Sequence, residues 1–207
     1  MLVWKYFGTA DFYTDVLAER INFGDPGSMS AYYQFASCLL VLGVIPALVI
    51  KIVLRERLAD YGLHLGHRLY TIRSALLGIP IFVIIGYFAA MDAGVREVFP
   101  INKLAGVTTP FLLHVFTYVL FYIGWEFHFR GFLQFGLSDS MGRTGAVMVQ
   151  VMASTLLHIG QPGTETFAAI GAGLLWGWTA HRTNSIAAGL LQHMALGLTL
   201  DAVIVFF

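Results

Sequence analysis

The stretch FLLHVFTYVLFYIGWEFHFRG, residues 111–131, decides how this chain must fold. Its apolar run from Phe111 to Ile123 continues without a turn signal into Glu126, and Arg130 follows one helical turn later. Ionisable side chains at membrane depth are costly, so they usually face a bundle interior or a water-filled cavity and are candidates for function. The stretch therefore predicts a membrane helix with a polar inner face, and it indicates Glu126 as a functional residue.

The composition supports a membrane protein. Hydrophobic residues make up 57% of the chain, charged residues only 12%, and the mean hydropathy is +0.74, whereas soluble domains are far more polar. The formal net charge of +0 argues against a nucleic-acid partner, because such partners require a basic face. Cys38 is the only cysteine, so neither a disulfide framework nor a cysteine metal site is expected. We expect an integral, multi-pass membrane protein whose partner is the lipid bilayer.

Apolar segments that could cross the membrane recur along the whole chain. A crossing helix needs about 20 residues, and shorter ones must pack among others or sit in a locally thinned bilayer. The sequence predicts an all-α, polytopic transmembrane helical bundle, one domain over 1–207 with its core motif region at 109–207. The N-terminal part, 1–32, mixes charges with aromatics and is expected either on the membrane surface or as a solvated amphipathic helix. Six segments are predicted: 33–54, 72–91, 109–136, 144–159, 165–181 and 185–207.

Polar or small residues recur every four positions on three of these segments, which places neighbours one above another on one helix face. A rise of about 1.5 Å per residue brings Glu126, His158 and His193 to similar depths, so one mid-membrane site is predicted. The spacing leaves open whether the three faces meet. The residues concerned are His114, Tyr118, Tyr122, Glu126, Arg130 and Gln134; then Gln150, Ser154 and His158; then Gly189, His193, Gly197 and Asp201.

Three ordered motifs resemble those of a known family. The run from Trp125 to Leu133 resembles the Glu-Glu-x-x-x-Arg signature of the CAAX-protease and bacteriocin-processing (CPBP) family, which includes Abi-type proteins. His158, with Glu165 after it, resembles the second motif, and the run 182–186 leading to His193 resembles the third. Together they span 111–201 in the family's order, so the resemblance is strong as a set.

The resemblance implies an intramembrane endopeptidase, in a prokaryotic cell membrane, that hydrolyses a peptide bond of a membrane-associated protein or peptide with glutamate-activated water. No cofactor is required on this interpretation. On the matching positions we predict Glu126 as the base and Arg130 as its orienting partner. His158 and His193 are predicted to bind the water and the oxyanion. Glu165, Asp201 and Gln192 are supporting candidates.

Three positions depart from the family pattern: Trp125, Gly197 and, as a minor difference, Ser154, where a phenylalanine often stands in the second motif. Trp125 stands where the family's first glutamate stands, the one assigned to catalysis in well-known members, so Glu126 takes the base role in our prediction. Gly197 replaces the asparagine expected four residues after His193. A preorganised oxyanion donor is worth about 3 to 4 kcal/mol of barrier. Gln192, a backbone amide or water would have to supply it.

A zinc site is the first alternative. Glu126, His158 and His193 form a three-ligand set with a free position for water, as in catalytic zinc sites. The chain has no His-Glu-x-x-His pair on one helix, so the ligands would have to converge from three helices. His64, His67, His128 and His181 are expected on loops or on the lipid-facing surface.

Simpler interpretations stand beside these. Glu126 and Arg130 also fit a structural ion pair that fixes helix register, and His158 fits a helix end. Glu165, in the first turn of its segment, fits helix-dipole complementarity. Trp125 and Gly197 also fit a catalytically inactive membrane scaffold, or a bacteriocin self-immunity protein, of the same fold. A small transporter is weaker, because the sequence has no internal repeat.

Overall fold

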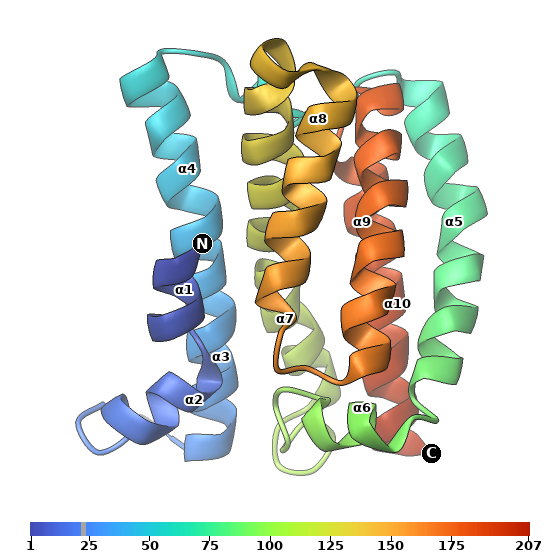
Figure 1. Ribbon diagram of the computed structural model, residues 1–207. Helices are drawn as coiled ribbons and strands as arrows, with labels where there is room; N and C mark the ends of the chain where they lie inside the picture. Colours follow the sequence, from blue (N-terminus) through green and yellow to red (C-terminus); the bar gives the residue numbers. More distant parts are fainter. Residues whose placement is uncertain (22–23) are drawn as a thin grey trace.

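The computed structural model describes residues 1–21 and 24–207 and is all-α, as predicted. Long helices run side by side, and short helices cover one side and one end of them (Figure 1). The short elements are α1 (Leu2–Phe7), α2 (Ala10–Phe12), η1 (Tyr13–Leu17), η4 (Leu58–Tyr61) and α6 (Ala93–Val98). The first long rod consists of α3 (Pro26–Cys38), η2 (Leu39–Val44), α4 (Ile45–Leu48) and η3 (Val49–Leu54). The others are α5 (Arg68–Ala89), α7 (Phe111–Glu126), η5 (Phe127–Leu133), α8 (Gln134–Leu157), α9 (Gly163–Thr183) and α10 (Ala187–Phe206).

Three helices in the described chain are long and apolar enough to cross a membrane: Pro26–Leu54, Arg68–Ala89 and Ala187–Phe206. The outer face of α5 exposes large apolar side chains, including Leu76, Leu77 and Phe88. Contiguous apolar surface of this kind marks contact with lipid or a partner. Each of the six predicted segments is largely helical, while the number of membrane crossings stays a prediction.

The start of the first segment and the end of the third segment differ from the prediction. The first long helix begins at Pro26, seven residues before the predicted 33, because the Asp25 side chain accepts a hydrogen bond from the Gly27 amide and Pro26 suits the first turn. The third helical stretch continues beyond the predicted 136 to Gly142, where a positive φ of 70° turns the chain. Glycine adopts that conformation without steric cost.

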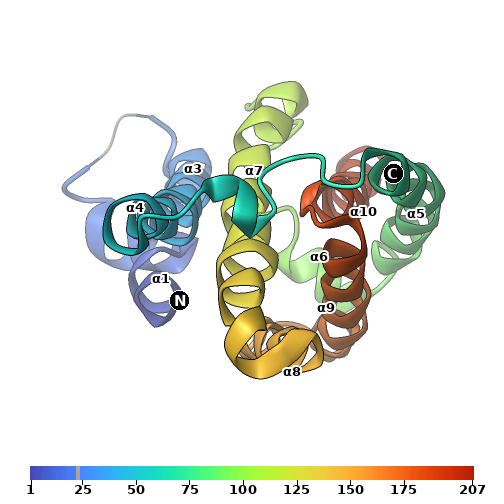
Figure 2. The same cartoon turned by 90° about the horizontal axis from the view of Figure 1, so that it is seen from above.

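The helices approach closely where they carry glycine. A Cβ on Gly124 of α7 would lie 2.6 Å from the carbonyl oxygen of Cys38, and one on Gly86 of α5 would collide with the carbonyl of Leu196 in α10. Small residues of this kind let helix backbones pack together in membranes. Seen from above, α7 lies between the α3–α4 rod and the α10–α5 pair, and α8 and α9 close the arrangement (Figure 2).

Buried glutamines fix α8 against α9. The Gln150 amide donates to the carbonyl of Gly173 at 2.8 Å, and the Gln134 amide donates to the carbonyl of Gly177 at 2.8 Å. Because a buried amide without partners would cost free energy, these bonds select one register between the two helices. They place the end of α8 beside the start of α9, where the candidate site lies.

Candidate active site

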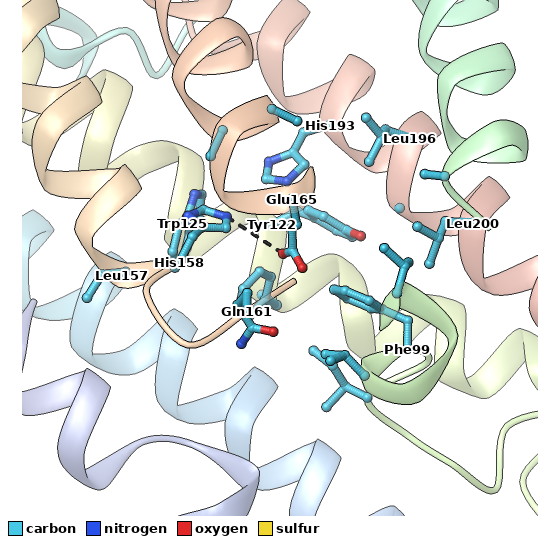
Figure 3. A pocket seen from close by; sticks show the side chains of 18 of the residues that line it. Phe99, Tyr122, Trp125, Leu157, His158, Gln161, Glu165, His193, Leu196 and Leu200 are labelled. Atoms are coloured by element: carbon cyan, nitrogen blue, oxygen red, sulfur yellow. Dashed lines mark ion pairs between the residues drawn. The ribbon is translucent and has the colours of Figure 1, made fainter. Parts of the chain in front are cut away.

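A cavity of about 900 Å³ lies among α5, α6, α7, α8, α9 and α10. Its polar lining includes Tyr122, Arg130, His158, Glu165 and His193. Figure 3 shows the apolar part of the wall, with Phe99, Leu196 and Leu200 on one side and Trp125 and Leu157 on the other. The structure therefore brings polar residues from α7, η5, α8, α9 and α10 to one hollow, which the sequence spacing allowed but did not show.

Glu126 and His193 meet directly between α7 and α10. The Nδ1–H of His193 donates to Oε1 of Glu126 at 2.8 Å, and Nη1 of Arg130 lies 3.2 Å from the same oxygen, near enough for an ion pair but not aligned as a hydrogen bond. The Glu126 side chain is 1% exposed and does not line the cavity, whereas that of His193 is 17% exposed and does. With Nδ1 held by the carboxylate, Nε2 of His193 is the nitrogen left free for the cavity.

Aromatic rings hold the imidazole of His193 in place. The Trp176 ring stacks on it with centroids 4.6 Å apart, and the Tyr122 ring meets it edge-on at 4.9 Å. Trp176 is itself fixed, because its Nε1–H donates to Gln192 at 3.0 Å and the Gln192 amide donates to the carbonyl of Ser74 at 2.8 Å. Both ends of the Gln192 amide are thus used inside the protein, and it does not line the cavity. Its predicted role as a substitute oxyanion donor does not fit these contacts.

His158 and Glu165 face each other across the turn between α8 and α9. His158 ends α8, and Gly160, with φ of 96°, reverses the chain so that Glu165 returns in the first turn of α9. The Nδ1–H of His158 donates to the carbonyl of Ser154 at 2.8 Å, while Nε2 lies 3.9 Å from Oε1 of Glu165 (Figure 3). His158 is therefore a helix-end residue whose ring also faces the cavity.

Trp125 and Lys5 complete the wall beside His158. The Trp125 ring meets the His158 ring edge-on, with centroids 5.4 Å apart. The Lys5 ammonium donates to the carbonyls of Leu157 at 3.0 Å and Ile159 at 3.3 Å, at the end of α8. Sequence reasoning missed Lys5, because no local pattern links residue 5 to a helix end more than 150 positions later.

Tyr122 occupies the space that a side chain at position 197 would need. A Cβ on Gly197 would collide with the Tyr122 hydroxyl group, so a larger residue at 197 and a tyrosine at 122 exclude each other. The Tyr122 ring is buried but borders the cavity. The sequence placed Tyr122 on the polar face of its helix, and only the fold shows that it lies against Gly197.

The structure differs from the sequence-based expectations for Asp201 and His128. Asp201, predicted as a supporting site residue, is buried in a separate pair with His114, whose Nε2 lies 2.8 Å from Oδ2 of Asp201, and neither residue lines the cavity. His128 was expected on a loop or on the lipid-facing surface, and that expectation is wrong, because the residue lies in η5 and is only 6% exposed. It packs edge-on against Phe129 in the interior.

The predicted zinc ligands do not form a metal-binding set. Within residues 1–21 and 24–207, no group of three or more His, Cys, Asp or Glu side chains is arranged to hold a metal ion. Glu126 and His193 are bonded to each other, and His158 presents only Nε2 to the cavity. The donor geometry is therefore unlike that of a catalytic zinc site, in which the three ligands converge on one point.

Comparison with known proteins supports the resemblance seen in the sequence. The family model described as type II CAAX prenyl endopeptidase Rce1-like matches residues 107–199, the stretch that holds Glu126, Arg130, His158, Glu165 and His193. No curated protein and no solved structure matches the chain. The match covers a little under half of the chain, and within it the ordered motifs are consistent with the CPBP family of membrane endopeptidases.

Proposed function

We propose that this protein is an intramembrane endopeptidase that hydrolyses a peptide bond in a membrane-associated protein or peptide. One observation carries the proposal. Two imidazoles from separate helices, His158 and His193, are each held through Nδ1 and border the same cavity. Peptide hydrolysis needs an activated water, stabilisation of the oxyanion and a proton for the leaving amine, and these groups can contribute to all three.

Glu126 supports this chemistry through His193. Its carboxylate is closed off from the cavity, so direct proton abstraction from water, its predicted role, is not favoured by its placement. A buried carboxylate that accepts from Nδ1–H orients an imidazole and stabilises its protonated form, as in the Ser-His-Asp triad. Arg130 balances the charge of Glu126 from the next turn. On this proposal, protonated His193 donates its Nε2–H to the carbonyl oxygen of the substrate as that oxygen becomes negative.

The Tyr122 hydroxyl is the second oxyanion donor in this proposal. It fills the space beside Gly197, where the family pattern would place an asparagine side chain. A phenol O–H can donate to an oxyanion as an amide N–H does. The pairing of Gly197 with Tyr122 thus restores a donor that the sequence alone showed as missing.

The apolar part of the cavity suits a substrate that comes from the membrane. Phe88, Phe99, Leu196 and Leu200 line it together with the polar groups. Such a lining buries apolar side chains of a bound segment and keeps bulk water away from the reacting atoms.

A catalytically inactive scaffold or self-immunity protein is the second candidate. It is favoured by Trp125, whose indole packs against the His158 ring where the family pattern would place a carboxylate. Scaffold function depends on the fold alone, so it should survive Glu126→Gln and His193→Ala. An endopeptidase should lose function in both while the proteins still accumulate.

Comparative proteomics of membrane extracts tests the proposal. Cells that lack the chromosomal copy would express wild type, Glu126→Gln, His193→Ala or the control Glu97→Gln, whose side chain is exposed at the cavity mouth. We expect at least one precursor to build up in cells with Glu126→Gln or His193→Ala. The same precursor should be shortened in cells with wild type or the control. If no protein differs in length between wild type and His193→Ala at equal expression, the proposal fails.

A further inference from the structure

Glu165 is the carboxylate that the cavity itself offers. Four acidic residues line the hollow in the described chain: Asp11, Asp92, Glu97 and Glu165. Asp11 and Glu97 are exposed at the mouth. Asp92 is already bonded through both oxygens, which accept from the Val95 amide and the Thr164 hydroxyl at 3.2 Å each. Glu165 is left as the mostly enclosed carboxylate, with its side chain 24% exposed and Oε2 without a hydrogen-bond partner.

The separation of Glu165 and His158 suits a bridging water. Their facing atoms, Oε1 and Nε2, lie 3.9 Å apart, which is too long for a direct hydrogen bond. Two hydrogen bonds of about 2.8 Å that meet at one water span roughly 4 to 4.5 Å, so a water bridges this slightly shorter gap once the two side chains move apart by about half an ångström. Because Nδ1–H of His158 is spent on the Ser154 carbonyl, Nε2 of the neutral ring is an acceptor. A water between the two groups can therefore give one hydrogen to each and turn a lone pair outward.

The proposed oxyanion donors, His193 and Tyr122, line the same cavity as Glu165. Figure 3 shows the Glu165 carboxylate among His158, His193 and Tyr122. A substrate carbonyl with its oxygen near His193 and Tyr122 would thus present its carbon to a water held at Glu165. Glu126 lies behind His193 and has no surface on the hollow.

We propose that Glu165 is the general base that activates the attacking water, with His158 positioning that water; this inference rests on the proposed endopeptidase function. Glu165 takes one proton as the water oxygen bonds to the carbonyl carbon. The carbonyl π electrons move to the oxygen, which His193 and Tyr122 hold. When the intermediate collapses, the C–N bond breaks and the proton passes from Glu165 to the leaving amine, which gives a carboxyl group and a free amine.

Matched variants of the full chain test this assignment. We would compare wild type, Glu165→Gln, Glu165→Asp, His193→Ala and the control Glu97→Gln for their initial rate of shortening of the precursor that membrane proteomics identifies. General-base catalysis contributes about 10²- to 10⁴-fold, so Glu165→Gln should slow cleavage at least about 100-fold. Glu165→Asp keeps a carboxylate and should retain more activity than Glu165→Gln. Immunoblots and thermal unfolding in detergent would establish equal accumulation and folding.

The outcomes separate this inference from the proposed function. If Glu165→Gln loses cleavage activity and Glu165→Asp keeps part of it, the result supports Glu165 as the base. If folded Glu165→Gln cleaves at the wild-type rate while His193→Ala does not, Glu165 is not the base and the endopeptidase function stands. If His193→Ala also leaves the precursor pattern unchanged, both proposals fall. If Glu165→Gln does not fold, Glu165→Asp and His158→Ala decide the question. A wild-type cleavage rate in Glu165→Asp, together with loss of cleavage in His158→Ala, supports the carboxylate role. Loss of cleavage in Glu165→Asp, together with full activity in His158→Ala, overturns it.

Discussion

The same two helices, α7 and α10, are joined by two acid–imidazole pairs that differ in access. His114 of α7 bonds to Asp201 of α10, and Glu126 of α7 bonds to His193 of α10, each at 2.8 Å. In the first pair both side chains are 0% exposed, and neither lines the cavity. In the second pair the acid is closed off while the imidazole opens onto the cavity.

The difference shows that pairing alone does not make a site. A buried acid–imidazole contact fixes helix register in either case. What His193 has in addition is a nitrogen that faces the hollow, aromatic rings that hold its orientation and a second cation, Arg130, near the acid. We therefore assign the Glu126–His193 pair to function and the His114–Asp201 pair to structure, and each of the following experiments tests that division.

The largest effect is expected from Glu126→Gln. Glutamine keeps the shape of the side chain but removes the charge that stabilises protonated His193, and the equivalent change in the Ser-His-Asp triad costs about 10⁴-fold. We expect a loss of about 10³- to 10⁴-fold in the cleavage rate of purified protein, at an unchanged expression level. A Glu126→Gln protein with normal turnover would remove the pair from the mechanism.

Asp201→Ala should act on stability instead. Removal of one partner from a buried pair leaves the other uncompensated and costs about 3 to 5 kcal/mol. We expect a lower unfolding temperature in detergent, while the protein that remains folded cleaves at nearly the wild-type rate. If folded Asp201→Ala were inactive, the division between the two pairs would be wrong.

Tyr122→Phe sharpens the account of the functional pair. The phenyl ring keeps the contacts with His193 and Tyr118 but loses the hydroxyl group. Removal of one oxyanion donor costs about 10²- to 10³-fold in kcat, so a loss near 10²-fold with little change in KM is expected. Tyr70→Phe, at an exposed tyrosine of α5 outside the cavity lining, is the control and should retain wild-type activity.

Metal removal should have the smallest effect. Since Glu126 and His193 are bonded to each other, we expect purified protein to contain zinc well below one ion per chain, and a chelator to leave cleavage within about twofold. Metal analysis and the cleavage rate after dialysis against a chelator measure this. Stoichiometric zinc, together with activity that is lost on chelation and regained with zinc, would reinstate the three-ligand set.

Hydropathy predicted the helices because lipid imposes a strong constraint on length and composition. The four-residue spacing also placed Arg130 correctly beside Glu126, because residues four apart on one helix are neighbours whatever the rest of the fold does. Which faces of separate helices meet depends on glycine contacts and buried amides, such as Gln150 on the carbonyl of Gly173, and no local pattern encodes these. The contact between His193 and Glu126 was thus possible from the sequence but not determined by it.

The sequence did not indicate the different positions of Glu126 and Glu165 relative to the cavity. The motif resemblance drew attention to Glu126, whereas the cavity is lined by Glu165, whose sequence context fits ordinary helix-dipole complementarity. Likewise, Gly197 indicated in the sequence that an oxyanion donor was missing, whereas the fold places the Tyr122 hydroxyl where a side chain at 197 would lie. Burial and compensation between distant positions are properties of the packed chain, and a single sequence carries no direct signal for them.

The π-helical turn η5, Phe127–Leu133, has a consequence for how this region tolerates change in length. A π-bulge accommodates extra chain within a helix, and such bulges are often found at functional sites. When one residue between Glu126 and Gln134 is removed, the turn can revert to α-geometry, and the helix after it keeps nearly its original orientation because the bulge had absorbed the extra residue. Gln134 would then still reach the Gly177 carbonyl, and α8 would keep its alignment with α9. A one-residue deletion in the regular part of α7 would instead rotate everything after it by about 100° and should be far less tolerated.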